Sequence, residues 1–176
     1  MSAKTAYHVR PTGSSDEVAV SALLELSYAA LMPASYELAL LARLLPIIGK
    51  ANPTLLASGT YYAALTDEGH IVGAGGWTQH RPDDGGQVAS TGHIRHFASH
   101  PDWIGQGVGR AIFDRCLAGA RAAGLQRFEC YASLNAVDFY RKLGFKAIGR
   151  VDIPIGSSFA AGDDLMMPAK LMERLL

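Results

Sequence analysis

Apolar and polar residues recur along the chain with two different periods, and each period predicts one kind of element. Alternation with a period of two is typical of half-buried strands, and a spacing of three to four residues is typical of amphipathic helices. The first pattern predicts seven strands, at residues 6–10, 60–66, 70–78, 93–99, 127–132, 146–155 and 163–172. The second predicts four helices, at residues 14–31, 34–49, 107–123 and 135–145.

Turn and cap residues mark where several of these elements begin and end. Ser14 or Ser15 is expected to cap the first helix and Ser35 the second, because a hydroxyl can accept from the free N–H groups at a helix start. The sequence Asp67–Gly69 predicts the turn of a hairpin between the second and third strands. Pro168 cannot donate to a ladder and therefore favours an edge position for the last strand.

The order of the elements predicts the fold class. Consecutive strands early in the chain favour antiparallel pairing, whereas the strands at 93–99 and 127–132 enclose a helix and should be parallel through a right-handed crossover. We therefore expect an α+β fold with a mixed, mostly antiparallel central sheet of about seven strands flanked by about four helices. The chain contains no repeat, linker or low-complexity segment, so residues 1–176 are predicted to form one domain.

Composition and charge exclude several classes of protein. The 176 residues are 49% apolar, which is typical of a globular chain, and 16 basic residues balance 16 acidic ones. This balance predicts neither nucleic-acid nor membrane binding. The N-terminus lacks the apolar run of a signal peptide, and the most apolar stretch, 38–48, is too short to span a bilayer. Cys116 and Cys130 lie in apolar segments, so we expect reduced core thiols and a cytoplasmic protein.

Three glycines, Gly105, Gly107 and Gly109, precede the third predicted helix in the stretch WIGQGVGRAIF. The first N–H groups of a helix have no intrahelical partner and the helix dipole makes that end positive, so bare backbone there suits an anion such as phosphate. A tight strand-to-helix turn without a ligand is the alternative. A Walker loop is excluded because Arg110-Ala111 follows the last glycine instead of Lys-Ser/Thr.

A dinucleotide-binding loop remains an alternative for the same glycines. Its fingerprint is G-x-G-x-x-G, whereas this loop is G-x-G-x-G and lies late in the chain beside a single crossover. Glu129, twenty positions after Gly109, could serve as the ribose-binding acid of such a site, or it is a half-exposed sheet residue.

Two stretches resemble the acetyl-CoA-binding core of the GNAT N-acetyltransferases: HIRHFASHPDWIGQGVGRAIFDRC and SLNAVDFYRKLGF. The signature of that family, Gln/Arg-x-x-Gly-x-Gly/Ala, is matched at Gly107 and Gly109, and Ile104 stands where the family prefers Gln or Arg. The resemblance covers residues 92–150, and the predicted order of elements upstream is also that of the family.

The resemblance implies acetyl-CoA as co-substrate and roles for named residues. The diphosphate would lie on the backbone amides of the glycine loop, which here are those of Gly105, Gln106, Gly107, Val108, Gly109 and Arg110. The pantetheine arm would pair with the strand before the loop, at Phe97, Ala98 and Ser99. Asn135 and Tyr140 would line the thioester cleft, with the Tyr140 hydroxyl giving a proton to the leaving thiolate. Neither a metal nor a redox cofactor is implied.

The general base is expected to be His93, which stands where some members of the family keep a glutamate. An imidazole with an ordinary pKa near 6.5 suits a base at neutral pH. The alternatives are a strand histidine that bonds a neighbour, another base, or a water relay. A metal site formed with His96 and His100 is not expected, because alternation sends His93 and His96 to opposite faces and about 13 Å of strand separates His96 from His100.

The acceptor is expected to be a primary amine of a small molecule or a peptide, selected by the segments 32–58 and 81–90. Residues 36–48 carry a wide apolar face, which predicts core packing and a homodimer contact in preference to an apolar acceptor pocket. Two other functions stay open on the sequence alone: a nucleotide-binding module, and a catalytically silent regulator that binds acetyl-CoA.

Overall fold

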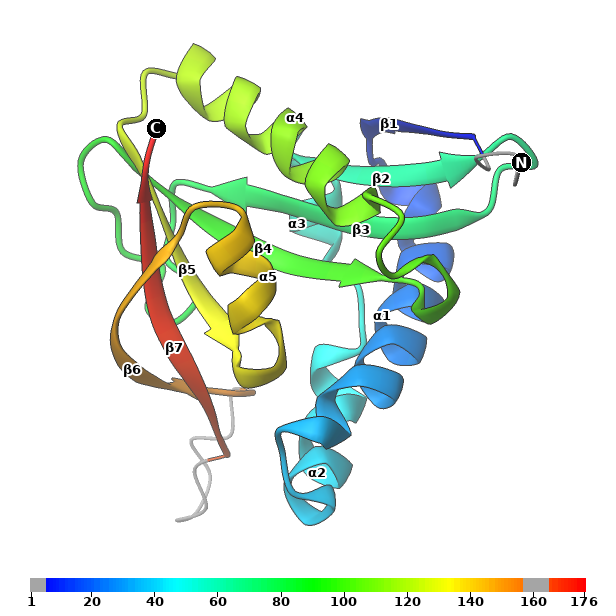
Figure 1. The fold of residues 1–176 in the computed structure, drawn as a ribbon, viewed down its shortest axis with the longest axis horizontal. Coiled ribbons are helices and arrows are strands. Elements are labelled where there is room, and N and C mark those ends of the chain that lie inside the picture. The colour runs from blue at the N-terminus through cyan, green and yellow to red at the C-terminus, as the bar shows by residue number, and fades with distance from the viewer. Residues whose placement is uncertain (1–5, 157–164) are drawn as a thin grey trace.

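A twisted sheet of seven strands runs through residues 6–156 and 165–176, the part of the chain that the computed structural model describes (Figure 1). The strands are β1 Tyr7–Pro11, β2 Tyr61–Thr66, β3 Ile71–Thr78, β4 Thr91–Ser99, β5 Arg127–Ser133, β6 Lys146–Pro154 and β7 Met166–Leu175. They lie in the order β1-β2-β3-β4-β5-β7-β6. The pairing of β4 with β5 is parallel, and the other five strand pairs are antiparallel.

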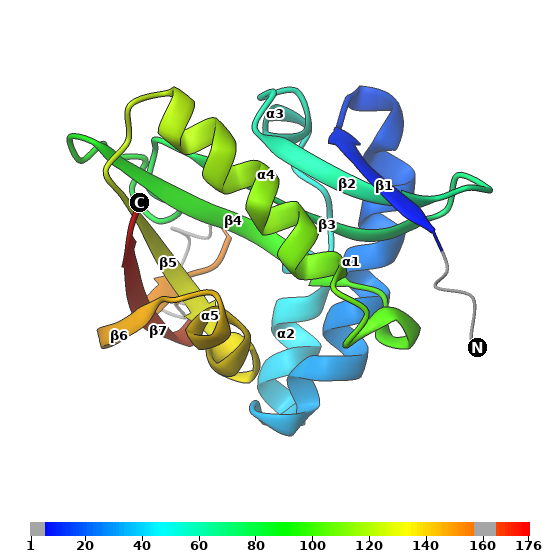
Figure 2. The same ribbon diagram turned by 45° about the horizontal axis from the view of Figure 1, so that its top comes forward.

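Helices cover both faces of this sheet (Figure 2). In the described residues they are α1 Glu17–Leu31, α2 Leu38–Ile48, α3 Pro53–Leu56, α4 Val108–Ala122 and α5 Val137–Lys142. The buried side chains of α4 and α5 form one core cluster with β5, whereas α1 packs on the opposite face and α2 packs on β6 and β7. The mixed α+β fold and the parallel crossover are therefore confirmed, with a fifth helix beyond the four expected.

The extra helix, α3, has only four residues and is too short for a periodic pattern to reveal. Its start is fixed by Asn52, whose side-chain oxygen accepts from the N–H groups of Thr54 and Leu55. By length and composition the helical stretch Ser14–Ala34 could cross a membrane, but in this fold its buried side chains pack against the sheet.

The predicted serine caps are wrong. At the start of the first helical stretch, the carboxylate of Asp16 accepts the N–H of Gly13 at 2.9 Å. The same carboxylate also holds the guanidinium of Arg10 through two bonds of 2.9 and 2.8 Å, and neither serine side chain caps this helical stretch. No side chain caps α2, whose N-cap residue is Glu37 rather than Ser35.

The edge position predicted for Pro168 is also wrong, because β7 lies between β5 and β6. The pairing with β5 reaches only to Ala169, however, so Pro168 lies one residue beyond its end. Its carbonyl accepts the Tyr36 hydroxyl at 2.6 Å. Since the nitrogen and carbonyl of one strand residue point to the same side, the missing N–H costs no ladder bond here. Asp163 and Asp164, which the sequence also assigned to this strand, lie outside the described residues.

Strands β4 and β5 separate after a short parallel contact, and this separation positions the site. They pair only from Thr91 to His93, opposite Arg127 to Glu129. Beyond this point β5 continues along β7 while β4 continues along β3. A β-bulge follows, because Arg95 faces Gly76 and Ala98 faces Ala74, so three steps on β4 oppose two on β3. The sheet is therefore open between the outer halves of β4 and β5.

Candidate active site

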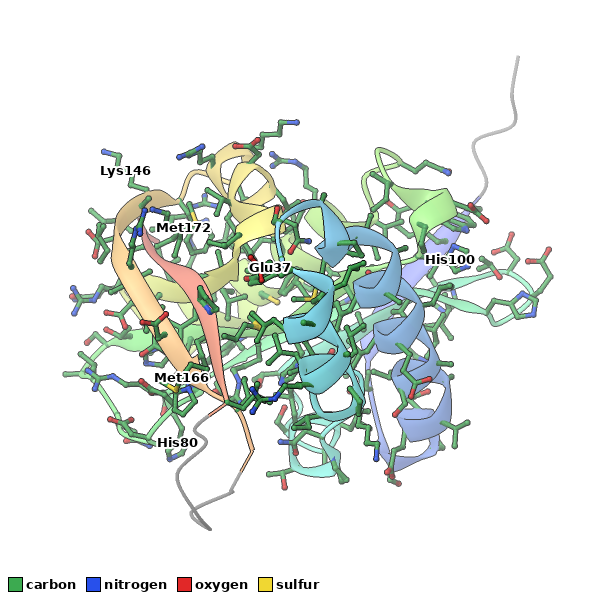
Figure 3. The ribbon with its side chains drawn as sticks, turned by 90° about the horizontal axis from the view of Figure 1, so that it is seen from below. Glu37, His80, His100, Lys146, Met166 and Met172 are labelled. Atoms are coloured by element: carbon green, nitrogen blue, oxygen red, sulfur yellow. The ribbon has the colours of Figure 1, made fainter. Side chains whose placement is uncertain are left out.

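A cleft of about 1180 Å³ lies where β4 and β5 have separated. One end is formed by the loop before α4, and the other by α1, α2 and the ends of β6 and β7. Figure 3 looks at the second end and shows α2 standing between α1 and the strands β6 and β7. The cleft thus joins the two faces of the molecule through the gap in the sheet.

The glycine loop has the backbone that the sequence suggested. Gly105 and Gly107 adopt φ values of +79° and +84°, in the left-handed region that disfavours side chains. Gly109 is required for a different reason, since a Cβ there would lie 2.8 Å from Cε2 of Phe139. The first two glycines therefore shape the loop, and the third lets α4 approach α5.

The N-terminus of α4 faces the cleft. Val108, Gly109 and Arg110 are its first three residues, so their N–H groups have no partner within the helix, and all three line the cleft. The Arg110 guanidinium donates to the carbonyl of Lys142, another lining residue, at 3.0 Å. The cationic side chains of Arg110 and Lys142, together with the N-terminus of α4, make this end of the cleft suitable for a diphosphate.

Gln106 does not take part in this surface. Its N–H donates to the carbonyl of Trp103 at 3.2 Å, and its side-chain amide donates to the carbonyl of Asp102 at 2.9 Å. The backbone N–H and one N–H of the side-chain amide are therefore used within the turn, and Gln106 does not line the cleft. Its predicted role in binding the diphosphate does not fit this geometry.

The structure brings the other predicted cofactor residues together. Those that line the same cleft are Phe97, Ala98, Ser99, Gly105, Gly107, Val108, Gly109, Arg110, Asn135 and Tyr140. Asn135 adds a polar group suited to a ligand, because its buried Oδ1 has no hydrogen-bond partner among the described residues. An unpartnered acceptor of this kind fits an amide N–H of the pantetheine arm.

Tyr140 lies on α5 within a cluster of aromatic rings. Its ring packs against Phe97, Phe139 and Phe145 at centroid distances of 6.2, 5.0 and 5.5 Å. Burial raises the pKa of its hydroxyl well above 10, and the neighbouring thiol of Cys130 adds to the effect. Tyr140 therefore keeps its proton at neutral pH and can donate a hydrogen bond into the cleft.

The structure does not bring His93 into the cleft. Its side chain is only 1% exposed, and it lies where β4 and β5 are still paired. Its Nδ1 is 3.6 Å from Oε2 of Glu129, and burial lowers the pKa of the imidazole below 6.5. Direct transfer of the acceptor's proton to His93 does not fit this geometry, because the ring is buried and does not line the cleft.

His96 is the histidine that lines the cleft, and the sequence reasoning missed it. It lies in the bulge of β4 with φ +44°, a conformation that His adopts more readily than most side chains. Burial lowers its pKa to about 4, so it is neutral at pH 7. Regular alternation along β4 does not predict that His96 faces the cleft, because the bulge changes the alternation. A bulge cannot be predicted from one sequence without knowing the partner strand.

The ionisable side chains of the cleft are mainly cationic. Lys50, Arg95, Arg110 and Lys142 line it, whereas no Asp or Glu among residues 6–156 and 165–176 does. In those same residues no three His, Cys, Asp or Glu side chains are grouped as a metal site would need. Cys116 and Cys130 are free and buried, as predicted.

Part of the predicted dimer-forming helix faces the same cleft. Leu41 and Leu44 are buried in the core, as expected, but Ile47 and Ile48 line the cleft. The C-terminal turn of α2 thus supports the acceptor-pocket alternative that the sequence analysis had placed second.

Comparison with known proteins gives this arrangement a family. The model of the acetyltransferase (GNAT) domain matches residues 47–160, more than half of the chain. A GCN5-related N-acetyltransferase from Rhodopseudomonas palustris is similar at 24% identity and a TM-score of 0.70, covering 96% of this chain and 95% of that one. The PaiA N-acetyltransferase from Thermoplasma acidophilum, solved in complex with coenzyme A, is similar at 14% identity and a TM-score of 0.71, covering 97% and 99%. The family model and the fold agree with the glycine loop and the open sheet: the chain belongs to the GNAT family of acetyl-CoA-dependent N-acetyltransferases.

Proposed function

We propose that the protein transfers the acetyl group of acetyl-CoA to a primary amine of a small molecule or a peptide by direct attack of the amine on the thioester. The observation that carries this proposal is the continuous cleft from the N-terminus of α4, through the gap between β4 and β5, to the space beside α2. A donor bound at the first end and an acceptor at the second would meet at the gap.

The donor is held at three places. The N–H groups of Val108, Gly109 and Arg110 bind the diphosphate, while the backbone of Phe97–Ser99 runs beside the pantetheine arm and the Asn135 side chain accepts one of its amides. The PaiA structure was solved with coenzyme A, which supports the same ligand for this cleft.

The reaction begins when the neutral amine attacks the carbonyl carbon of the thioester. A C–N bond forms and the carbonyl electrons move to oxygen; the intermediate then collapses, the C–S bond breaks, and the electron pair leaves with sulfur. Tyr140 donates its hydroxyl proton or hydrogen bond to that sulfur and regains a proton through water. The amine loses one proton, so the products are the N-acetylated amine and the CoA thiol.

Water is the acceptor of the amine's proton in this proposal. No carboxylate of the described residues lines the cleft, and an imidazole with a pKa of about 4 at His96 is a weak base. A Lys-like amine with a pKa near 10.4 is only about 0.04% neutral at pH 7. The rate should therefore rise with pH as the acceptor itself deprotonates.

Two measurements test the proposal. Calorimetry with acetyl-CoA, NAD and ATP should show binding of acetyl-CoA alone, and stabilisation by NAD or ATP instead would contradict it in favour of a nucleotide-binding module. Release of CoA thiol across an amine panel should then identify turnover. Binding of acetyl-CoA without acetylation of any amine would favour the silent regulator.

A further inference from the structure

Arg95 presents a positive charge without a carboxylate partner to the cleft. The residue is half-buried on β4, immediately before the bulge at His96, and its side chain lines the cleft. Its Nη1 donates to Oγ1 of Thr78 at 3.0 Å. No carboxylate of residues 6–156 or 165–176 forms an ion pair with it, so most of its five donors are left for a ligand.

This charge is held out of water without compensation from the protein. Burial lowers the pKa of the Arg95 guanidinium. The Tyr61 phenol acts in the opposite direction, but it is neutral at pH 7 because burial raises its own pKa well above 10. A half-buried cation is costly unless an anion accompanies it. A planar guanidinium with free donors is also the side chain best shaped to take both oxygens of a carboxylate.

An apolar surface lines the same cleft as Arg95. We call it the apolar wall, and its residues are Leu31, Met32, Ile47, Ile48, Ile153 and Ile155. The segment after β6 lies close to α2 here, since a Cβ added to Gly156 would be 3.6 Å from Cδ1 of Ile47. The wall offers few polar partners, so a second charge on the acceptor would be poorly solvated there.

Resting on the acetyltransferase function proposed above, we propose that the acceptor is an α-amino acid with an apolar side chain, whose carboxylate binds the Arg95 guanidinium. An α-amino acid carries its amine, carboxylate and side chain on one carbon. Arg95 immediately precedes the bulge on β4, beside the gap where donor and acceptor would meet, and the apolar wall lines the same cleft. The three groups of the ligand thus match three features of one cleft.

The same features disfavour the other acceptor classes. A polyamine would bring a second cation next to Arg95 without a carboxylate from the described lining residues to receive it. The N-terminus of a peptide has an amide in place of the carboxylate and would leave the guanidinium unpaired.

The binding test uses product analogues, so that it does not depend on turnover. The affinities of N-acetyl-L-leucine and N-acetyl-L-leucinamide are measured by calorimetry on the CoA-bound protein, with N-acetylglycine to report the apolar wall. We expect N-acetyl-L-leucine to bind about 10- to 100-fold more tightly than the amide, as for a charge-assisted bond, and more tightly than N-acetylglycine.

Variants test whether Arg95 is the residue that binds the carboxylate. Arg95→Gln should remove the preference for the carboxylate, and Arg95→Lys should retain part of it, because Lys keeps the charge but not the fork. The matched control is Arg121→Gln, because Arg121 is an exposed arginine on α4 that does not line the cleft. This variant should bind the analogues as the wild type does.

Initial rates of CoA release are also compared for L-leucine and L-leucinamide, and we expect faster turnover of L-leucine. The amide has the more readily deprotonated amine, so faster turnover of L-leucine cannot come from amine ionisation. Equal affinities, tighter binding of the amide, or no detectable binding of either analogue would overturn the proposal while acetylation of amines still stood. A preference for N-acetyl-L-leucine that Arg95→Gln abolishes, in a protein that acetylates nothing, would support the anion site and reject the acetyltransferase function.

Discussion

Tyr140 combines two roles at the scale of a single residue. Its ring packs among Phe97, Phe139 and Phe145, whereas its hydroxyl lies in the cleft beside Cys130. Because burial raises its pKa well above 10, full loss of the proton is unfavourable. Help to the leaving thiolate must therefore come as a strong hydrogen bond, or as a proton that is quickly replaced.

Replacement of Tyr140 by Phe separates these two roles. The ring still packs, so we expect Tyr140→Phe to fold with the stability of the wild type to within about 1 kcal/mol. Loss of a general acid costs 10²–10⁴-fold in rate, and since the CoA thiol is a fair leaving group we expect the low end, about 10²-fold in kcat. The affinity for acetyl-CoA, measured by calorimetry, should hardly change.

Tyr131→Phe is the matched control for this prediction, because that hydroxyl also belongs to a residue of the cleft but is bound to Asp83 at 3.1 Å. It should keep the wild-type kcat. The Tyr140→Phe defect should also shrink with an acetyl thioester whose thiol is more acidic than that of CoA. A wild-type rate for Tyr140→Phe when chemistry is rate-limiting would leave the residue with its packing role alone.

Single residues also mark the limit of what the sequence could predict about the site. The glycines were predictable, since Gly105 and Gly107 do adopt positive φ. The burial of His93 outside the cleft was not predictable, because the position of a histidine relative to the glycine loop does not reveal where β4 and β5 stop pairing. Arg95 lies in the stretch that resembles the family, but the resemblance assigned it no role, and the role proposed for it rests on the lack of a carboxylate in the lining of the cleft.

The glycine loop is the element on which donor binding depends, and Gly107→Ala tests it. A Cβ at φ +84° costs about 1–2 kcal/mol of strain and stands on the loop that faces the diphosphate. We expect the affinity for acetyl-CoA to fall about 10- to 100-fold, as for the loss of a charge-assisted hydrogen bond. Acetyl-pantetheine, which lacks the diphosphate, should lose far less when both are measured by calorimetry.

The variant Gly69→Ala shows how much backbone strain alone changes the affinity for acetyl-CoA. Gly69 in the β2–β3 turn has φ +85° with open space around its Cβ position, and it does not line the cleft. Gly69→Ala should lower the free energy of unfolding by a similar amount yet bind acetyl-CoA normally. Equal losses of affinity for acetyl-CoA and acetyl-pantetheine in Gly107→Ala would show that the loop does not hold the diphosphate.

Elements were predictable wherever a local pattern determined them. All seven strands and the four longer helices carry a clear period. The serine caps are wrong because the Asp16 carboxylate binds the nearby Arg10 guanidinium and the Gly13 N–H at this helix start. The edge position of Pro168 is wrong because a distant partner determines the local structure: Tyr36 bonds the carbonyl of Pro168 inside the sheet, and these residues are 132 positions apart.

At the scale of the whole molecule, the gap between β4 and β5 couples function to folding. A continuous sheet would bury more ladder bonds, but it would have no passage between the glycine loop and α2. Strand β4 carries two imidazoles whose pKa burial lowers: the buried His93, at the last paired position, and the half-buried His96, which lines the cleft.

These imidazoles make the stability of the fold depend on pH. The folded pKa of His96 is about 4, below the value of about 6.5 in the unfolded chain. Between these values the unfolded chain binds a proton that the folded chain does not, so stability falls as pH decreases from about 6.5 to 4 and is unaffected above that window. The lowered pKa of His93 acts in the same direction.

The variant His96→Asn measures this contribution, because Asn tolerates the positive φ at this position and does not titrate. From denaturant unfolding at pH 7 and pH 4.5, we expect the wild type to lose about 2–3 kcal/mol more than His96→Asn does over that interval. His70→Asn, at an exposed position after the β2–β3 turn, is the control and should follow the wild type. If His96→Asn lost as much stability as the wild type on acidification, the imidazole of His96 would not be held neutral by burial, and it would become a candidate for the base that removes the acceptor's proton.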